Sequence, residues 1–143
     1  MGELRGSGGV RAVAGVAAVL VVGAGLGVRA VGGGELAKYA GDALYTVLVY
    51  ALVVLVAPRL RPVAAGAVAA GLSWVVELFQ LTGVPDGLAR RSTVARLVLG
   101  STFNAPDLCW YLVGAAAAAL LHAGAVRLVR SASVGRGTAP GRA

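Results

Sequence analysis

The chain has 143 residues, of which 58% are hydrophobic and 13% are charged, and its formal net charge is +7. This composition excludes a disordered chain and is unlike that of soluble domains, in which about a quarter of the residues are charged. A single cysteine and a single histidine argue against a disulfide framework, a zinc–thiolate cluster and a histidine-based metal site. The sequence therefore predicts an integral membrane protein with no cofactor, no metal and no second folded module.

Four stretches of the chain are apolar enough to cross a bilayer, which takes about 20 residues of helix, or fewer where flanking arginines snorkel. They cover residues 12–28, 43–57, 63–84 and 108–126. We therefore predict an all-α fold, a four-helix transmembrane bundle that forms a single domain over residues 1–130. The first stretch follows two arginines and contains small residues, so a cleaved secretory signal is the alternative to a span there.

A segment of mixed charge joins the third and fourth stretches. Its residues Arg90, Arg91 and Arg96 would point in widely different directions on one helix, which argues against a simple amphipathic surface helix. The apolar run around Leu97 favours a short helical or re-entrant segment in the mouth of the bundle, where its backbone is buried in protein or faces water. At least one arginine should therefore reach inward, and Asn104 is a candidate cap for the fourth helix.

Charge is divided unevenly between the two ends of the predicted bundle. The end with both termini and the turn near Pro58 carries eight arginines against one glutamate, whereas the opposite end carries five basic and five acidic residues. Because loops rich in arginine stay in the cytoplasm, both termini are predicted to be cytoplasmic. These arginines suit the anionic headgroups of the bilayer, and no motif or aromatic interleaving indicates nucleic acid. Residues 131–143 offer nothing to bury and are predicted to be a disordered basic tail.

Polar residues of three spans converge at the other, outward end. Ser73, Glu77 and Gln80 share one helix face through their spacing. Asp42 and Asp107 lie at the starts of the second and fourth predicted spans. Charges at membrane depth are costly and often mark a function. The structural alternatives are an ion pair between Glu77 and an arginine, and aspartates that complement helix dipoles.

Five motifs follow one another along the predicted membrane core. They are Gly25-Leu-Gly-Val-Arg29, Lys38-Tyr-Ala-Gly-Asp42-Ala-Leu-Tyr45, Glu77-Leu-Phe-Gln80, Arg96-Leu-Val-Leu-Gly100-Ser-Thr-Phe103, and Asp107 with Tyr111 and Gly114. In order and spacing, residues 25–114 resemble a family of small bacterial membrane proteins, domain of unknown function 2809, itself similar to the VanZ-like proteins. The resemblance implies a multi-pass protein of the bacterial plasma membrane.

The same resemblance implies a set of ligand-binding residues and a direction for the site. VanZ-like proteins are associated with tolerance of teicoplanin, a lipid-bearing antibiotic that acts at the outer leaflet, which fits a site that faces outward. No catalytic or metal-binding residue is implied. The family's polar positions correspond to Arg29, Lys38, Asp42, Glu77, Gln80, Arg96 and Asp107.

Three functions are compatible with these residues. The favoured one is binding or translocation of an amphipathic lipid-like or lipid-linked molecule, because guanidinium groups bind phosphate or carboxylate in a bidentate manner. Four helices are few for a transporter, so translocation would require a homo-oligomer. The alternative is a non-catalytic structural or regulatory protein with an internal ion-pair network. An enzyme that uses Glu77 with an aspartate as acid and base is disfavoured, because no nucleophile has a histidine base.

Overall fold

The computed structural model describes residues 2–137, and the side chains of residues 7–132. Its elements are α1 (Gly2–Val31), α2 (Glu35–Val56), α3 (Pro62–Gln80), α4 (Val84–Ala89), α5 (Thr93–Leu99) and α6 (Asp107–Gly137). All elements in this part of the chain are helices, and α1, α2, α3 and α6 are long and apolar enough to span a membrane. The predicted all-α, four-helix membrane bundle is confirmed.

The helix ends differ from the predicted spans. α2 begins at Glu35 rather than at residue 43, because charged residues end an apolar run without ending a helix, and Lys38 pairs with Asp42 one turn later. α3 ends at Gln80 rather than at residue 84, and Gly83 adopts a left-handed conformation with φ 74° before α4.

The last helix also continues beyond the predicted fourth span. α6 runs to Gly137 through the first half of the predicted disordered tail 131–143, since no proline interrupts it and each added residue extends the hydrogen-bond ladder. Residues 138–143 of that predicted tail lie outside the described residues.

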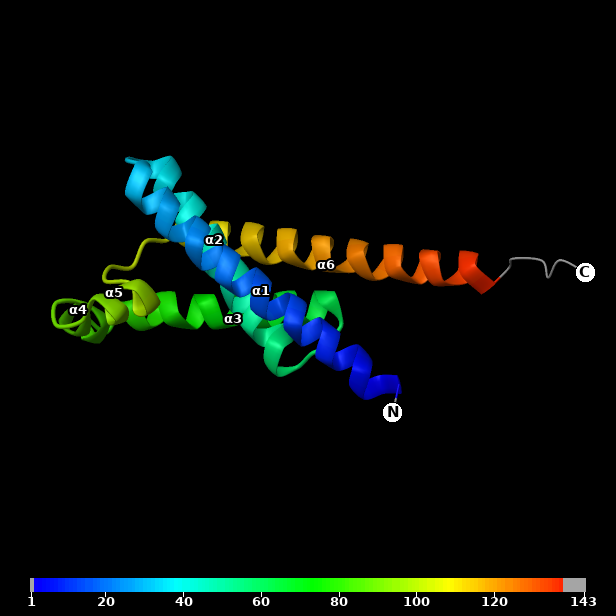
Figure 1. The fold of residues 1–143 in the computed structure, drawn as a ribbon. Coiled ribbons are helices and arrows are strands. Elements are labelled where there is room, and N and C mark those ends of the chain that lie inside the picture. The colour runs from blue at the N-terminus through cyan, green and yellow to red at the C-terminus, as the bar shows by residue number, and fades with distance from the viewer. Residues whose placement is uncertain (1, 138–143) are drawn as a thin grey trace, which may run out of the picture.

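Helices α2, α3 and α6 form the centre of the bundle, and α1 contacts only α2 among the described helices. Figure 1 shows α3 and α6 side by side and antiparallel, with α1 and α2 crossing them diagonally. The α1–α2 connection, α4, α5 and the start of α6 gather at one end, which we call the cavity end. The start of α1, the α2–α3 turn and the last turns of α6 lie toward the other end.

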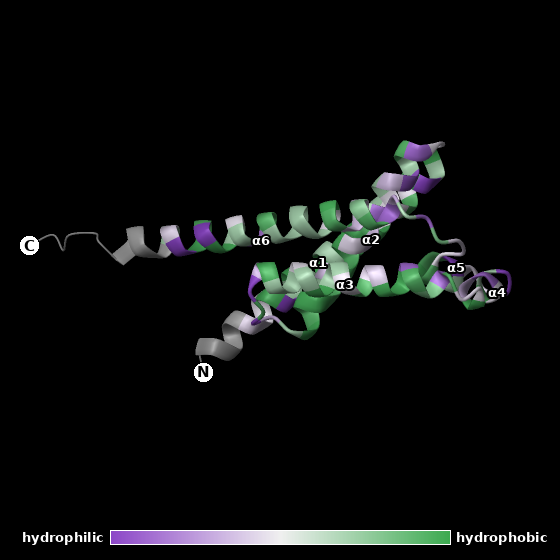
Figure 2. Cartoon of the chain, turned by 180° about the vertical axis from the view of Figure 1, so that it is seen from behind, coloured by the Kyte–Doolittle hydropathy of each residue, from purple (hydrophilic) through white to green (hydrophobic). Residues whose placement is uncertain are grey.

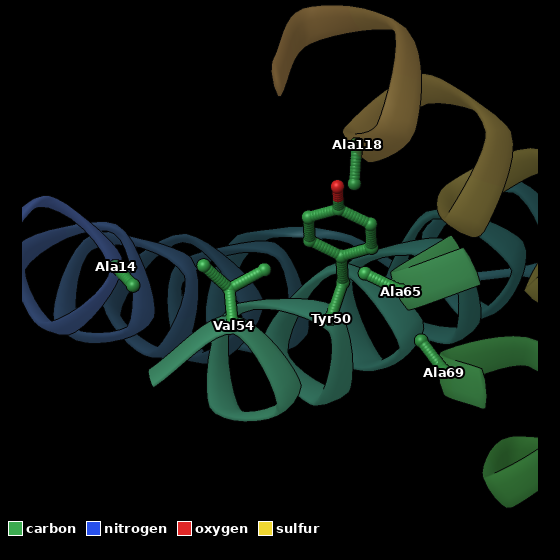
Figure 3. Packing of buried hydrophobic residues seen from close by; sticks show 6 residues of the cluster. All are labelled: Ala14, Tyr50, Val54, Ala65, Ala69 and Ala118. Atoms are coloured by element: carbon green, nitrogen blue, oxygen red, sulfur yellow. The ribbon is translucent and has the colours of Figure 1, made fainter. Parts of the chain in front are cut away.

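Small residues let the central helices approach closely. Ala65 and Ala69 of α3 have no exposed surface, and Ala118 of α6 is 7% exposed. Figure 3 shows the Tyr50 ring reaching from α2 toward Ala118, and its hydroxyl lies 2.8 Å from His122 Nδ1. Because helix association in lipid depends on such close packing and on interhelical hydrogen bonds, Tyr50 and His122 have a packing role.

The outer faces of the long helices are apolar. Val19 and Leu20 of α1 and Leu120 of α6 each leave at least two thirds of their surface exposed. In Figure 2 the middle of each long helix is mainly hydrophobic, and hydrophilic residues collect around α4, α5 and the start of α6. Such faces suit hydrocarbon, and the bilayer is therefore the natural surrounding of this bundle.

The two ends of α6 are expected to face opposite sides of the membrane. Cys109 is exposed in the first turn of α6, and Ser131 is exposed near its other end. A membrane-impermeant maleimide added to intact cells should label Cys109. In a Cys109→Ser background, the thiol of Ser131→Cys should be labelled only after the cells are permeabilised. Labelling of both positions from one side would contradict the span, and the reverse pattern would contradict an outward cavity end.

Candidate functional site

A partly open cavity of about 260 Å³ lies at the cavity end of the bundle. Its walls come from α2, α3, α5 and α6, and Arg29 contributes from the end of α1. The structure brings all the residues that were proposed as ligand-binding to this one cavity. They are Arg29, Lys38, Asp42, Glu77, Gln80, Arg96 and Asp107.

Helical spacing explains how the central helices direct these side chains inward. On α3, Ser73, Glu77 and Gln80 recur at intervals of three and four residues, and all three are buried. On α6, Asp107 and Tyr111 are four residues apart and are 4% and 6% exposed. Residues at this spacing lie on the same face of a helix, so the predicted polar faces are those that meet in the bundle.

Glu77 is held by uncharged donors. Its carboxylate accepts a hydrogen bond from the backbone N–H of Asn104 at 2.7 Å and one from the Tyr111 hydroxyl at 2.8 Å, and the residue is 1% exposed. The ion pair between Glu77 and an arginine, expected as its structural role, is absent from the described residues. Two hydrogen bonds to a carboxylate offset part of its desolvation, and these two donors stand where a cationic partner was expected.

Two polar residues near the start of α6 have roles that residue type alone does not indicate. Tyr111 is buried, and its hydroxyl bond makes it a partner of Glu77. Asn104 was the candidate cap of the fourth helix, but its side-chain amide donates to Asp107. Only the position of Tyr111 one turn after Asp107 signalled that it faces the same interior.

Lys38 joins the two aspartates of the cavity. Its ammonium group is 3.3 Å from Asp42 Oδ2 and also forms an ion pair with Asp107, so it links α2 to the start of α6. Asp107 stands in the first turn of its helix, as the dipole interpretation requires. Asp42 lies well inside α2, where the helix dipole has little effect, so the dipole interpretation of Asp42 is wrong.

Two side chains of the long helices hold α5 in place. The Tyr45 hydroxyl donates to the Val98 carbonyl at 2.9 Å, and Gln80 Nε2 donates to the Leu99 carbonyl at 2.8 Å. Ser92 caps the start of α5 by accepting from the Ala95 N–H. These contacts place Arg96 at the cavity.

The segment between α3 and α6 is therefore two short helices, where one helical or re-entrant segment was predicted. Of its arginines, Arg96 is the one that reaches the cavity. Arg90 pairs with Asp86 within α4, and the Arg90 side chain is 74% exposed. The expectation that at least one arginine reaches inward is confirmed.

A comparison with protein-family models gives one assignment. The model of a protein family of unknown function, DUF2809, matches residues 32–115. The chain belongs to this family. The matched range includes every proposed ligand-binding residue except Arg29, which lies just before it. No curated protein and no solved structure matches the chain. The similarity to VanZ-like proteins and the bacterial origin stay predictions.

Several polar groups of this cavity have no hydrogen bond or ion pair within the described residues. Arg29 and Arg96 are exposed and have no ion pair or hydrogen bond within the described residues. Gln80 Oε1 is buried and accepts no hydrogen bond. By contrast, the three acids of the cavity are each paired. The unused binding capacity of the site thus includes two guanidinium groups and one buried amide oxygen. The hydroxyls of Ser101 and Thr102 also line the cavity and form no hydrogen bond within the described residues.

The described part of the cavity has no cluster of side chains that could bind a metal ion. Among the residues that the structure describes, no group of three or more histidine, cysteine or carboxylate side chains could hold a metal ion. Cys109 is exposed near the start of α6.

Proposed function

We propose that this membrane protein binds the headgroup of an anionic, amphipathic lipid-like or lipid-linked molecule in the cavity at the ends of α2, α3, α5 and α6. The observation that carries the proposal is the division of charge within the cavity. Lys38 pairs with both aspartates, and Glu77 is satisfied by Tyr111 and Asn104, whereas Arg29 and Arg96 have no partner among the described residues. Free cationic groups beside satisfied acids favour an anionic ligand.

The equal numbers of acidic and basic residues at this end do not oppose an anion. If both arginines were paired with acids, an anionic ligand would have to break those pairs and expose buried carboxylates. Here the acids keep their own partners when Arg96 or Arg29 binds a ligand. Planar guanidinium groups match phosphate and carboxylate through two parallel hydrogen bonds, which gives such a site its geometric selectivity.

Apolar residues next to the arginine support an amphipathic ligand. Leu97 and Val98 follow Arg96 on α5, line the same cavity and are 40% and 51% exposed. A headgroup at Arg96 would thus have apolar surface beside it for the first part of a hydrocarbon chain. By the distribution of arginine along the chain, we propose an outward-facing site in a bacterial plasma membrane, with both termini cytoplasmic. Translocation, as opposed to binding, would need a homo-oligomer.

A structural or regulatory role is the second candidate, and one observation favours it. Lys38 connects α2 to α6 through its ion pair with Asp107, as an internal ion-pair network would. We do not propose an enzyme, because both oxygens of Glu77 are occupied by fixed donors and the acid has no adjacent nucleophile with a histidine base.

Lipid retention tests the proposal. The full chain is purified gently, and its retained lipids and glycolipids are identified by mass spectrometry for the wild type, Arg96→Gln and Arg90→Gln. We expect the wild type to retain one anionic class selectively and Arg96→Gln to lose it about tenfold or more, as expected for a lost charged hydrogen bond. Arg90 lies outside the cavity and pairs with Asp86, so Arg90→Gln is the matched control and should retain the wild-type profile.

A variant without Arg96 that retains the same lipids as the wild type would contradict the proposal. Identical lipid profiles in the wild type and in a folded Arg96→Gln variant, judged by unchanged helical circular dichroism, would overturn ligand binding at this cavity. The ion-pair role of Lys38 would then be the better account of the polar residues, and protein partners would replace lipids as the object of the search.

A further inference from the structure

The buried amide of Gln80 has an acceptor that the protein does not use. Gln80 is 8% exposed, and its Oε1 has no hydrogen-bond partner in the described residues. Its Nε2 donates to the Leu99 carbonyl at 2.8 Å, which fixes the orientation of the amide. Buried polar atoms are nearly always hydrogen-bonded, so an unused acceptor inside a cavity calls for a donor from outside the chain.

The end of α5 approaches this amide closely because residue 100 is a glycine. Gly100 ends α5 with φ 69°, and a Cβ there would lie 2.4 Å from Gln80 Nε2 and 3.7 Å from Oε1. Only glycine tolerates both the backbone conformation and this approach. Gly100 and Gln80 both line the cavity, as Arg29 and Arg96 do, so the unused acceptor lies on a residue of the same site.

The unused groups together describe one kind of ligand. We infer that the cavity takes a hydroxyl-bearing phosphate ester, whose phosphate binds the guanidinium of Arg96 while a hydroxyl of its alcohol part donates to Gln80 Oε1. This inference rests on the proposed function and specifies the chemistry of its headgroup. Arg29 supplies a second guanidinium at the same cavity.

The charges of the cavity favour a hydroxyl over an ammonium group as the donor. Lys38 forms ion pairs with both aspartates, and Tyr111 and Asn104 donate hydrogen bonds to Glu77. Each carboxylate of the cavity therefore already has a partner within the protein. The unmet acceptor is a neutral amide, which a neutral hydroxyl satisfies without a further charge. The unpaired guanidinium groups of Arg29 and Arg96 would also repel an ammonium group.

The size of the cavity limits how much of the ligand it encloses. A volume of about 260 Å³ is below the range of about 300–1,000 Å³ that holds drug-sized ligands. It therefore suits a polyol phosphate or sugar phosphate headgroup, with hydrocarbon chains left outside along Leu97 and Val98. The same chemistry is present in a phospholipid headgroup and in a free phosphate ester, and binding measurements separate the two sources.

A pair of lipids that differ only in hydroxyl groups tests the inference. Affinities of the full chain in neutral detergent are measured by isothermal titration calorimetry for dioctanoyl phosphatidylglycerol and dioctanoyl phosphatidylpropanol, which carry the same charge. We expect the wild type to bind phosphatidylglycerol about tenfold more tightly. Gln80→Met has a similar shape but lacks both the amide acceptor and the donor that binds the Leu99 carbonyl. The loss of the bond to Leu99 acts on both lipids alike, so the two affinities are expected to become equal.

The outcomes distinguish this inference from the proposed function. Equal wild-type affinities that Arg96→Gln reduces would overturn the hydroxyl contact and leave anion binding intact. A preference that survives in Gln80→Met would also overturn it. Affinities that Arg96→Gln leaves unchanged would overturn the proposed function itself. Because the wild-type comparison needs no variant, equal affinities there would overturn the hydroxyl contact even if Gln80→Met fails to fold.

Free sn-glycerol 3-phosphate is the remaining probe, and it identifies the source of the phosphate ester. If it binds far more weakly than phosphatidylglycerol, the headgroup of a lipid is supported. If the two bind equally, the hydroxyl-bearing phosphate ester is still supported, but a soluble molecule rather than a lipid is its source, and the amphipathic part of the proposed function is overturned.

Discussion

Gly114→Ala is expected to destabilise the bundle by about 2–3 kcal/mol, the upper part of the range for overpacked sites. A Cβ at Gly114 would lie 2.3 Å from the Ala43 carbonyl oxygen and 3.0 Å from its carbon. These are backbone atoms of α2, which cannot rotate away as a side chain could. The added methyl group must therefore push α6 away from α2, and this separation would also lengthen the ion pair between Lys38 and Asp107.

Unfolding in sodium dodecyl sulfate, followed by helical circular dichroism, measures this effect. Gly124→Ala is the matched control, because Gly124 lies on the same helix and a Cβ there meets no atom within 4 Å. Alanine favours a helix by up to about 1 kcal/mol over glycine, so the control should be neutral or stabilising. If Gly114→Ala proves as stable as Gly124→Ala, then α2 and α6 do not approach as closely as the structure has them.

Tyr111→Phe should cost about 1.5–3 kcal/mol, although it removes a single oxygen atom. The Tyr111 hydroxyl donates to Glu77 Oε2 at 2.8 Å, and Glu77 is 1% exposed. Without this donor, one carboxylate oxygen of a buried acid has lost its hydrogen bond, and no cation in the described residues replaces it. The same unfolding titration gives the change in free energy.

Two comparisons show whether the lost hydrogen bond is the cause. Tyr39→Phe also removes a phenol oxygen, but Tyr39 acts through its ring, which stacks on Trp110 with centroids 5.2 Å apart, so a change below about 0.5 kcal/mol is expected. In a double-mutant cycle, Tyr111→Phe should cost much less when Glu77 is already replaced by leucine. Additive effects in that cycle would show that the hydroxyl does not support Glu77.

The proposed ligand-binding residues illustrate how far local patterns reach. Glu77 and Gln80 could be assigned to one face because helical spacing is a property of the chain alone, and burial confirms that face. The partner of Glu77 could not be assigned from the same pattern. One of its donors is the backbone N–H of Asn104, a group that almost every residue carries, so no residue type marks it. Arginine was the expected partner because residue types in a sequence identify charged side chains, whereas they do not identify which backbone N–H groups will be near.

Hydropathy and helical spacing act over neighbouring residues, so the membrane class, the all-α fold, the four spans and the polar residues that share a helix face could be predicted from the chain. Which groups pair and which remain free depends on how the helices pack. The end of α5 lies against the Gln80 amide because Gly100 has no side chain. Lys38 and Tyr111 satisfy the acids only because α6 lies beside α2 and α3. Arg96 and Gln80 Oε1 are left unused for the same reason. Such pairing depends on distances between segments far apart in the chain, which no local pattern encodes.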